Sequence, residues 1–133
     1  CIEMTVGVIE EKGKIKALSP SITIAESAIL SVEEKFQGGT GVNVTPPPKE
    51  IISAKNLNKA KDKVEQIAKK LGIRGYSRID IFVKVVTGDI IVIEVNTLPG
   101  LTPSTVFFHQ ALAENPPIYP VQLLEKIIKN AGY

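Results

Sequence analysis

The stretch Gly75-Tyr76-Ser77-Arg78-Ile79-Asp80, followed by Glu94-Val95-Asn96-Thr97-Leu98-Pro99-Gly100, decides how this chain folds and where its chemistry lies. Both stretches belong to segments rich in β-branched residues, 73–86 and 89–96, which predict two neighbouring strands. These strands carry an arginine, two carboxylates and a carboxamide, which we call the quartet (Arg78, Asp80, Glu94 and Asn96). A hairpin that only filled a core would have no use for such a set.

The turn between the two strands decides whether the quartet lies on one face. Side chains alternate between the faces of a strand, so each strand contributes its two polar groups to a single face. A two-residue turn at Thr87-Gly88 would pair Val86 with Asp89 and would separate the two pairs. A three-residue loop of residues 86–88 would pair Val85 with Asp89 and would gather them. Such loops favour glycine at the left-handed position, where Gly88 lies, so we predict the second register.

In that register Asp80 lies opposite Glu94, and Arg78 lies opposite Asn96. Opposed side chains have β-carbons about 4.5–5.5 Å apart, so the two carboxylates repel each other unless a cation or a proton intervenes. Two carboxylates and an amide oxygen form an all-oxygen set suited to magnesium, with arginine facing phosphate or a developing oxyanion. A solvated polar face with an ordinary cross-strand ion pair explains the same residues, and the geometry alone leaves both interpretations open.

The composition is that of an ordinary globular domain. The 133 residues are 44% hydrophobic and 23% charged, with a net charge of +2 that gives no argument for a nucleic-acid partner. No segment has the length and apolarity of a membrane span. One cysteine excludes an internal disulfide, which favours a reducing, cytoplasmic setting. The chain begins at Cys1 within a strand-like run, so we expect a single domain, residues 1–133, of a longer protein.

The remaining patterns predict a sheet with three helices. Residues 4–9 and 14–18 predict a hairpin, residues 22–24 a short extended piece, and residues 31–49 a long loop. A helical period begins at Asn56 and ends at Gly72. Further helices are predicted near residues 105–113 and from Pro120, the last with an apolar stripe of Val121, Leu124, Ile127 and Ile128. We therefore predict an α+β fold, a largely antiparallel sheet with its helices packed on one side.

Four motifs follow one another along the chain: residues 3–8 (Glu-Met-Thr-Val-Gly-Val), residues 34–40 with Glu34-Lys35-Phe36 and Gly38-Gly39-Thr40, residues 75–80, and residues 94–103. In this order they resemble the motifs of D-alanine–D-alanine ligases, which are ATP-grasp enzymes. The resemblance covers nearly the whole chain, and its Glu-Val-Asn-Thr-Leu-Pro-Gly run is highly specific. It implies the C-terminal subdomain of an ATP-grasp fold, with ATP and Mg²⁺ (or Mn²⁺) as cofactors.

The resemblance also implies a role for each matching residue. Asp80, Glu94 and Asn96 would hold magnesium, while Arg78 and the Gly100 amide would stabilise negative charge during catalysis. Glu3 would accept hydrogen bonds from the ribose of ATP, and Lys35 would reach its phosphates. Ser104 and Thr105 would bind the carboxylate of the second amino acid. Each has a plainer alternative: Lys35 and Glu3 as solvated surface residues, and Ser104 and Thr105 as helix caps. His109 fits a helix surface better than a catalytic base.

The implied activity is ADP-forming ligation of two D-alanines through an acyl phosphate, for peptidoglycan precursor synthesis. Phe36, where the family often has tyrosine, and the order Ser104-Thr105 instead of Thr-Ser leave another amino or hydroxy acid open. The implied partners are a small amino acid and a missing N-terminal part of the same protein, without nucleic acid or membrane, and a homodimeric parent is compatible with the family. We expect the isolated chain to be inactive. The alternatives are a non-catalytic nucleotide- or metal-binding module and a purely structural fragment.

Overall fold

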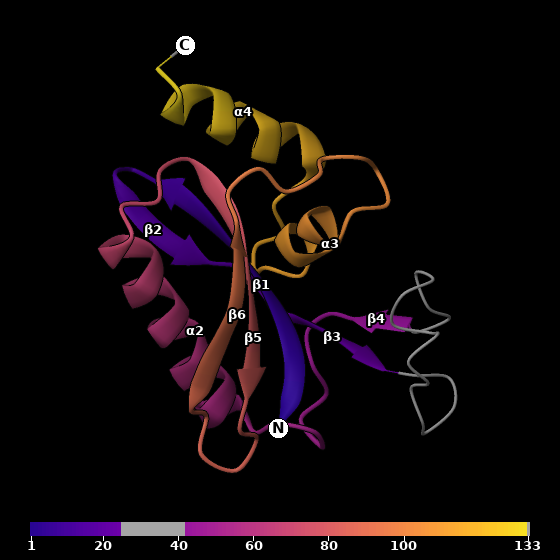
Figure 1. Cartoon of the computed structure of the whole chain (residues 1–133). Coiled ribbons are helices and arrows are strands. Elements are labelled where there is room, and N and C mark those ends of the chain that lie inside the picture. Colours follow the sequence, from indigo (N-terminus) through magenta and orange to yellow (C-terminus); the bar gives the residue numbers. More distant parts are fainter. Residues whose placement is uncertain (25–41, 133) are drawn as a thin grey trace.

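The computed structural model describes residues 1–24 and 42–132. In these ranges six strands form one antiparallel sheet in the order β4-β3-β1-β5-β6, with β2 paired to the C-terminal half of β1 (Figure 1). The strands are β1 (Ile2–Glu11), β2 (Lys14–Ala17), β3 (Ser21–Ile24), β4 (Val42–Val44), β5 (Tyr76–Val83) and β6 (Ile90–Asn96). β1 is central because it pairs with β2, β3 and β5, and the strand β4 lies within the predicted loop 31–49, where we expected none.

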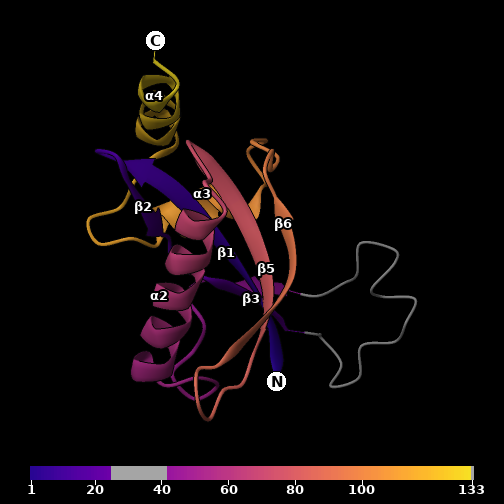
Figure 2. The ribbon, with the colours of Figure 1, turned by 60° about the vertical axis from the view of Figure 1, so that its left-hand side comes forward.

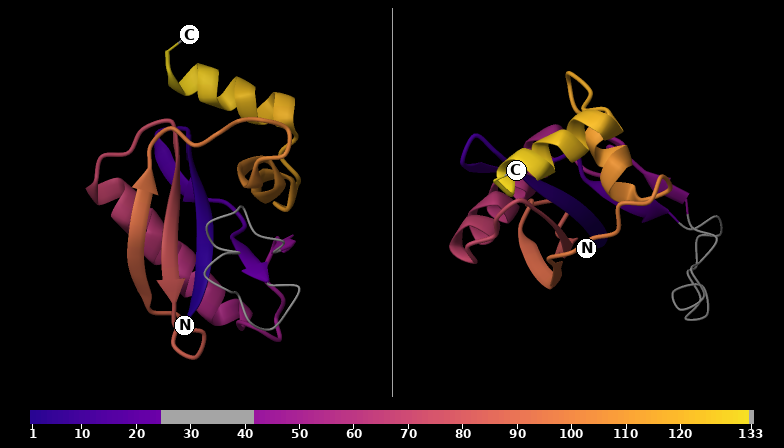
Figure 3. Two further views of the ribbon diagram at one scale, coloured as in Figure 1. Left: turned by 45° about the vertical axis from the view of Figure 1, so that its right-hand side comes forward. Right: turned by 90° about the horizontal axis from the view of Figure 1, so that it is seen from above.

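The three helices are α2 (Ala54–Lys70), α3 (Val106–Leu112) and α4 (Pro120–Asn130). α2 runs along one face of the sheet, and α4 crosses the end of the sheet opposite the N-terminus (Figures 2 and 3). The α2 helix ends as predicted at Gly72, whose φ of 68° closes the last turn. The Ile73 amide donates to the Ala68 carbonyl at 3.0 Å, and the Gly72 amide donates to Lys69 at 3.1 Å, a Schellman arrangement that aims the chain into β5.

The sheet is covered on both faces, so the expectation of helices on one side is wrong. Alternate residues of β1, among them Met4, Val6 and Val8, pack with Val64 and other buried residues of α2. The opposite face of β1 contributes Ile9 to a second cluster with residues of α3 and α4. The reason is the period of two along β1. One face is apolar along Met4, Val6 and Val8, and on the other face Gly7 and Ile9 are buried and need a cover of their own.

Gly7 allows α3 to approach the sheet closely. A Cβ atom at this position would lie 2.6 Å from Gln110 Oε1 and 2.9 Å from the Phe107 ring. The Gly7 amide instead donates to Gln110 Oε1 at 2.7 Å. Gln110 Nε2 donates to the Thr5 carbonyl at 2.8 Å and to Ser21 Oγ at 3.1 Å. Gln110, which is fully buried, therefore fills the gap where β2 has ended and β3 begins beside β1.

The β5–β6 hairpin has the predicted pairs but not the predicted loop. Asp80 lies opposite Glu94, and Arg78 lies opposite Asn96. The loop, however, comprises the four residues 85–88, because the Lys84 amide donates to the Asp89 carbonyl at 2.8 Å. A β-bulge then shifts the register, so that Ile81 lies opposite Val92 while Asp80 lies opposite Glu94. The longer loop and the bulge cancel at the quartet, and the three-residue loop is a wrong prediction.

The N-terminal part of α2 holds this loop in place. Asn56 Nδ2 donates to the carbonyls of Val85 and Val86 at 2.8 and 2.9 Å, and Lys59 Nζ donates to the Thr87 carbonyl at 2.8 Å. Gly88, with a φ of 70°, is buried against the Asn56 backbone. These contacts fix the end of the hairpin away from the quartet, and so they make the β5–β6 register specific.

The α4 helix packs on a different stripe from the predicted one. Leu123 is fully buried and Ile127 packs beside it, whereas Val121, Leu124 and Ile128 are exposed. Of the predicted stripe, only Ile127 thus faces the core. None of the helices in the described ranges is long and apolar enough to cross a membrane.

Candidate functional site

The quartet lies on the face of the sheet opposite α2. The residues between its members in β5, Ile79 and Ile81, are fully buried against α2, so the alternation of the strand turns Arg78 and Asp80 to the other face. Cross-strand pairing then places Glu94 and Asn96 on that same face. The structure therefore brings together the four residues that the sequence predicted.

The quartet carries more negative than positive charge. Arg78 Nη2 lies 3.2 Å from Asp80 Oδ2 and 3.9 Å from Glu94 Oε1. The Asp80 side chain is only 13% exposed, whereas that of Glu94 is 61% exposed. One guanidinium thus lies beside two carboxylates, of which Asp80 is sheltered and Glu94 is open to solvent. The quartet therefore has a net negative charge, which a further cation could offset.

Two sheltered atoms of the quartet have no hydrogen-bond partner. They are Asp80 Oδ1 and Arg78 Nε, each buried within the described structure. An unpaired buried polar atom costs about 1–3 kcal/mol, and more when the group is charged. A free carboxylate oxygen can bind a cation and a free guanidinium N–H can bind an anion, and these two belong to side chains that contact each other through their other atoms.

Asn96 ends β6 and shapes the turn that follows. Its Oδ1 accepts a hydrogen bond from the Leu98 amide at 3.1 Å, and its backbone carbonyl accepts one from Ser77 Oγ at 2.8 Å. The Asn96 side chain is therefore held in place by a local turn rather than left free to rotate. An amide oxygen has a second lone pair, so this hydrogen bond leaves Asn96 able to contact a ligand.

The other predicted site residues are distributed around the quartet. Glu3 is exposed on β1 and lies opposite Phe82 of β5, which places it on the quartet's face. Gly100 lies in the exposed turn before α3, and its carbonyl accepts from Thr105 Oγ1 at 2.9 Å. Thr105 caps α3 by accepting the Phe107 amide at 3.2 Å, so the capping role is confirmed. Lys35 lies outside the described residues, as do Phe36 and the glycines 38–41.

Ser104 lines a small polar cavity between β4 and α3. The cavity has a volume of about 370 Å³, and Thr45 and His109 also line it. Thr45 Oγ1 lies 2.5 Å from Ser21 Oγ, which accepts a hydrogen bond from Gln110. A chain of hydrogen bonds thus leads from this cavity to β1.

Sequence reasoning missed two buried polar residues that organise the site strands. Gln110 binds the β1 backbone at Gly7 and Thr5, which lie opposite Arg78 and Asp80. Glu10 accepts the Gly75 amide at 2.8 Å and the Arg74 Nε at 3.1 Å, and these two contacts lower the pKa of the Glu10 carboxyl. For Gln110 the sequence signal was a polar residue within an apolar helical segment, whereas Glu10 lies in the charged run Glu10-Glu11-Lys12 and gave no such signal.

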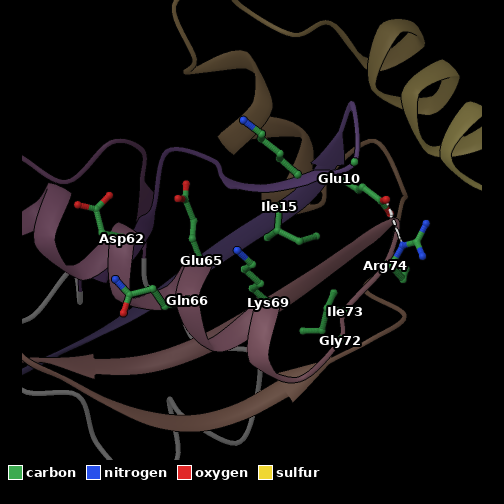
Figure 4. Close-up of a pocket in the computed structure, with 11 residues that line it drawn as sticks. Glu10, Ile15, Asp62, Glu65, Gln66, Lys69, Gly72, Ile73 and Arg74 are labelled. Atoms are coloured by element: carbon green, nitrogen blue, oxygen red, sulfur yellow. Dashed lines mark hydrogen bonds and ion pairs between the residues drawn. The ribbon is translucent and has the colours of Figure 1, made fainter.

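A larger cavity of about 800 Å³ lies on the α2 side, between α2 and the β1–β2 hairpin (Figure 4). Glu10, Glu65, Lys69 and Arg74 are among the residues that line it. Glu65 accepts a hydrogen bond from the Ala17 amide at 2.8 Å, and Glu10 is bound to Arg74, so both carboxylates already have partners. The cavity is separate from the quartet. In the described ranges, no three His, Cys, Asp or Glu side chains gather as a metal site.

Comparisons with a family model, with related sequences and with solved structures all indicate the same family. The family described as "D-ala D-ala ligase C-terminus" matches residues 1–129. A D-alanine–D-alanine ligase of Carboxydothermus hydrogenoformans is 30% identical over 128 residues, which are 96% of this chain and 39% of that protein.

Solved structures give the same picture. The D-alanyl-alanine synthetase A of Vibrio cholerae has a TM-score of 0.67 at 27% identity, over 99% of this chain and 39% of the other. A Bacillus anthracis D-alanine–D-alanine ligase complexed with ATP has a TM-score of 0.70 at 22% identity, over 98% and 38% of the two chains. The chain thus spans about two fifths of the length of these relatives, and its fold is that of their C-terminal ATP-grasp part.

Proposed function

The chain belongs to the family of D-alanine–D-alanine ligase C-terminal domains, and on that premise we propose that it supplies the magnesium- and phosphate-binding part of an ATP-dependent carboxylate–amine ligase. The observation that carries the proposal is the quartet itself. A sheltered carboxylate with an unpaired oxygen lies opposite a second carboxylate, beside an arginine with an unpaired N–H. A surface with a purely structural role would have paired these atoms, because leaving them unpaired is costly.

The donor set fits a hard divalent cation. Asp80 and Glu94 offer carboxylate oxygens and Asn96 offers an amide oxygen, which are the ligand types that Mg²⁺ and Mn²⁺ take in proteins. Magnesium typically binds through one or two carboxylates and completes its coordination with phosphate and water, so two carboxylates are sufficient. When bound, the ion would supply positive charge that offsets the charge of the transferring phosphoryl group.

Arg78 is placed to act on the anionic side of the same reaction. Its guanidinium contacts Asp80 through one nitrogen, and its Nε has no partner. The Nε–H can therefore donate a hydrogen bond to a phosphate oxygen or an oxyanion. The backbone amide of Gly100 would add a second donor, the role that the resemblance to the ligases implies for this turn. Such donors act strongly on charge that develops in the transition state, because they need no reorganisation when the reaction occurs.

The rest of the quartet's face suits a nucleotide. Phe82 and Ile91 lie opposite each other, 40% and 59% exposed, next to Glu3 on β1. Two apolar side chains beside a carboxylate would offer a surface to a base and a hydrogen-bond acceptor to a ribose. This layout supports ATP as the nucleotide, which the Bacillus anthracis relative binds. Lys35 would reach the phosphates.

The proposed reaction joins two D-alanines and forms ADP. The carboxylate of the first D-alanine would attack the terminal phosphorus of ATP, giving an acyl phosphate and ADP. The amine of the second would then attack the acyl carbon, release phosphate and lose a proton to form the peptide. Ser104 and Thr105 would bind the second carboxylate, near the polar cavity that Ser104 lines. A longer, cytoplasmic parent protein serving peptidoglycan precursor synthesis would carry out this reaction, whereas the isolated chain would not.

The test uses the complete protein with ATP, D-alanine and magnesium, and measures ADP release. We expect Glu94→Gln and Asp80→Asn each to lower turnover at least about 100-fold, the size of effect seen when one electrostatic catalytic group is lost. The matched control is Asp89→Asn, which changes a carboxylate on the same hairpin outside the quartet and should retain activity. Unchanged turnover in both quartet variants would reject the proposal that the quartet is the catalytic site of a ligase. A wild-type protein that binds ATP without releasing ADP would favour the non-catalytic module.

A further inference from the structure

The α4 helix has two apolar faces, of which only one contacts the rest of the described chain. On the inner face Leu123 is fully buried and Ile127 packs beside it. Lys126 Nζ binds Glu11 Oε1 at 2.5 Å, and Asn130 Nδ2 donates to the Glu10 carbonyl. These polar contacts flank the inner face and fix the rotation of α4, so that its other apolar residues cannot turn inward.

The second face consists of Val121, Leu124 and Ile128, which we call the outer stripe. These residues follow one another at the three- and four-residue spacing of a helix face. They are 67%, 38% and 53% exposed in the described structure. Single exposed aliphatic residues are common, but an aligned row on a helix already anchored by a neighbouring face is typical of a surface that another element covers.

The size of the outer stripe argues against a second copy of the chain as that element. A stable interface between separate proteins buries roughly 800 Å² on each partner and involves about 20–30 residues a side. Three aliphatic side chains on an eleven-residue helix fall far below this size. An element of the same polypeptide needs no such area, because the covalent connection raises its effective concentration to the millimolar range.

The relatives indicate where such an element comes from. The matching family describes a C-terminus, and the ligases that match are more than twice as long as this chain. We propose that the outer stripe of α4 is a docking surface for the polypeptide that precedes this chain in the complete protein. The inference rests on the longer parent of the proposed function, but it does not depend on the quartet or on any activity.

The occupant's chemistry follows from the residues around the stripe. Glu125 and Lys129, both exposed, lie on the helix side next to the stripe. An apolar centre with charged residues at its border matches the composition of interfaces between domains. The occupant should therefore present aliphatic or aromatic side chains to Val121, Leu124 and Ile128, while Glu125 and Lys129 stay accessible to solvent at its border.

Cysteine labelling tests the proposal in the complete protein. Cys1 and any further reactive cysteines are first changed to serine, because Cys1 is exposed. Ile128→Cys then reports on the outer stripe, and Glu125→Cys on the same helix is the matched control. Labelling rates with iodoacetamide are measured for the native protein and scaled to the rate in urea. We expect Ile128→Cys to react at least tenfold more slowly than Glu125→Cys.

Equal scaled rates at both positions would overturn the proposal, since the outer stripe would then be open to solvent. Slow labelling that becomes fast on dilution, together with a dimer in sedimentation, would also overturn it in favour of a second copy. Slow labelling that is independent of concentration supports docking within one polypeptide. Because no turnover is measured, failure of the ligase proposal through the Glu94→Gln test remains a separate result.

Discussion

Replacing Gln110 with methionine should destabilise the protein because the Gln110 side chain forms hydrogen bonds with the backbone of β1. Methionine has a similar length and volume and helix propensity, but it can neither accept from the Gly7 amide nor donate to the Thr5 carbonyl. In the described structure these contacts measure 2.7 and 2.8 Å, and Gln110 is fully buried. The substitution thus removes hydrogen bonds while leaving the packing volume nearly unchanged.

The expected magnitude follows from the fate of each backbone group. The Gly7 amide lies in the gap between β2 and β3, so its loss of a partner costs about 1–3 kcal/mol. Loss of the bond to the Thr5 carbonyl adds about 1 kcal/mol. Ser21 keeps its contact with Thr45 and adds little. We therefore expect the free energy of unfolding to fall by about 2–4 kcal/mol, a large part of the roughly 5–15 kcal/mol typical of a domain.

Urea unfolding and amide hydrogen exchange measure this effect at two levels. The midpoint in urea should fall without a change in slope, because the surface exposed on unfolding is unaltered. Exchange at the Gly7 amide should accelerate by about tenfold for each 1.4 kcal/mol lost. His109→Gln, an exposed neighbour on the same helix, is the control and should change the free energy of unfolding by less than about 0.5 kcal/mol.

The reasoning would be refuted by a Gln110→Met protein that unfolds within about 0.5 kcal/mol of the wild type and keeps the Gly7 amide protected. That result would mean that β1 closes on β2 and β3 without the glutamine. A second variant, Gln110→Glu, sharpens the test. It keeps an acceptor for Gly7 but places a carboxylate against the Thr5 carbonyl, so it should be destabilised more than Gln110→Met at neutral pH.

Three further predictions concern residues outside the quartet. Hydrogen bonds from Gly75 and Arg74 lower the pKa of the Glu10 carboxyl in the folded protein below its usual 4.5. The ionised Glu10 therefore stabilises the fold above pH 4.5, and this stabilisation is lost as the pH falls through the pKa of the folded state. Glu10→Gln should therefore flatten the fall of the unfolding free energy below pH 5, measured by urea titrations against pH. Gly88→Ala should cost about 2 kcal/mol or more in thermal unfolding, because φ is 70° and the new Cβ meets the Asn56 carbonyl at 2.8 Å. Gly13→Ala, at φ 78° in open space, should cost only the backbone strain of about 1–2 kcal/mol, and equal losses at both glycines would contradict the clash. Thr105→Ala removes the cap of α3 and should lower the free energy of unfolding by about 0.5–2 kcal/mol. Ser104→Ala, which leaves the cap in place, is the control.

The β5–β6 hairpin shows how a correct prediction can rest on an incorrect detail. The alternation of polar residues predicted that Asp80 faces Glu94, and the structure confirms this pair. The loop that was to produce it is one residue longer than predicted, and a bulge near Val92 restores the register. Burial of Ile79 and Ile81 fixes which face of β5 is apolar, so the hairpin adopts whatever loop and bulge keep those residues inside.

Sequence patterns alone determined the local elements and the quartet. Apolar periodicity and turn residues specified α2 with its end at Gly72, and the polar spacing in two strands marked the candidate site. These features depend on side chains a few residues apart along one segment, where the periods of helix and strand apply directly. The family motifs added the ligase interpretation.

Only the tertiary structure decided which surfaces meet. It placed helices on both faces of the sheet, turned the outer stripe of α4 to solvent, and put Gln110 into the gap beside Gly7. These outcomes depend on contacts between residues about a hundred positions apart, and on polar anchors such as Asn130 to Glu10 that override a helix's own apolar pattern. A period along one segment says which face is apolar, but the energy of packing against every other segment decides what covers it.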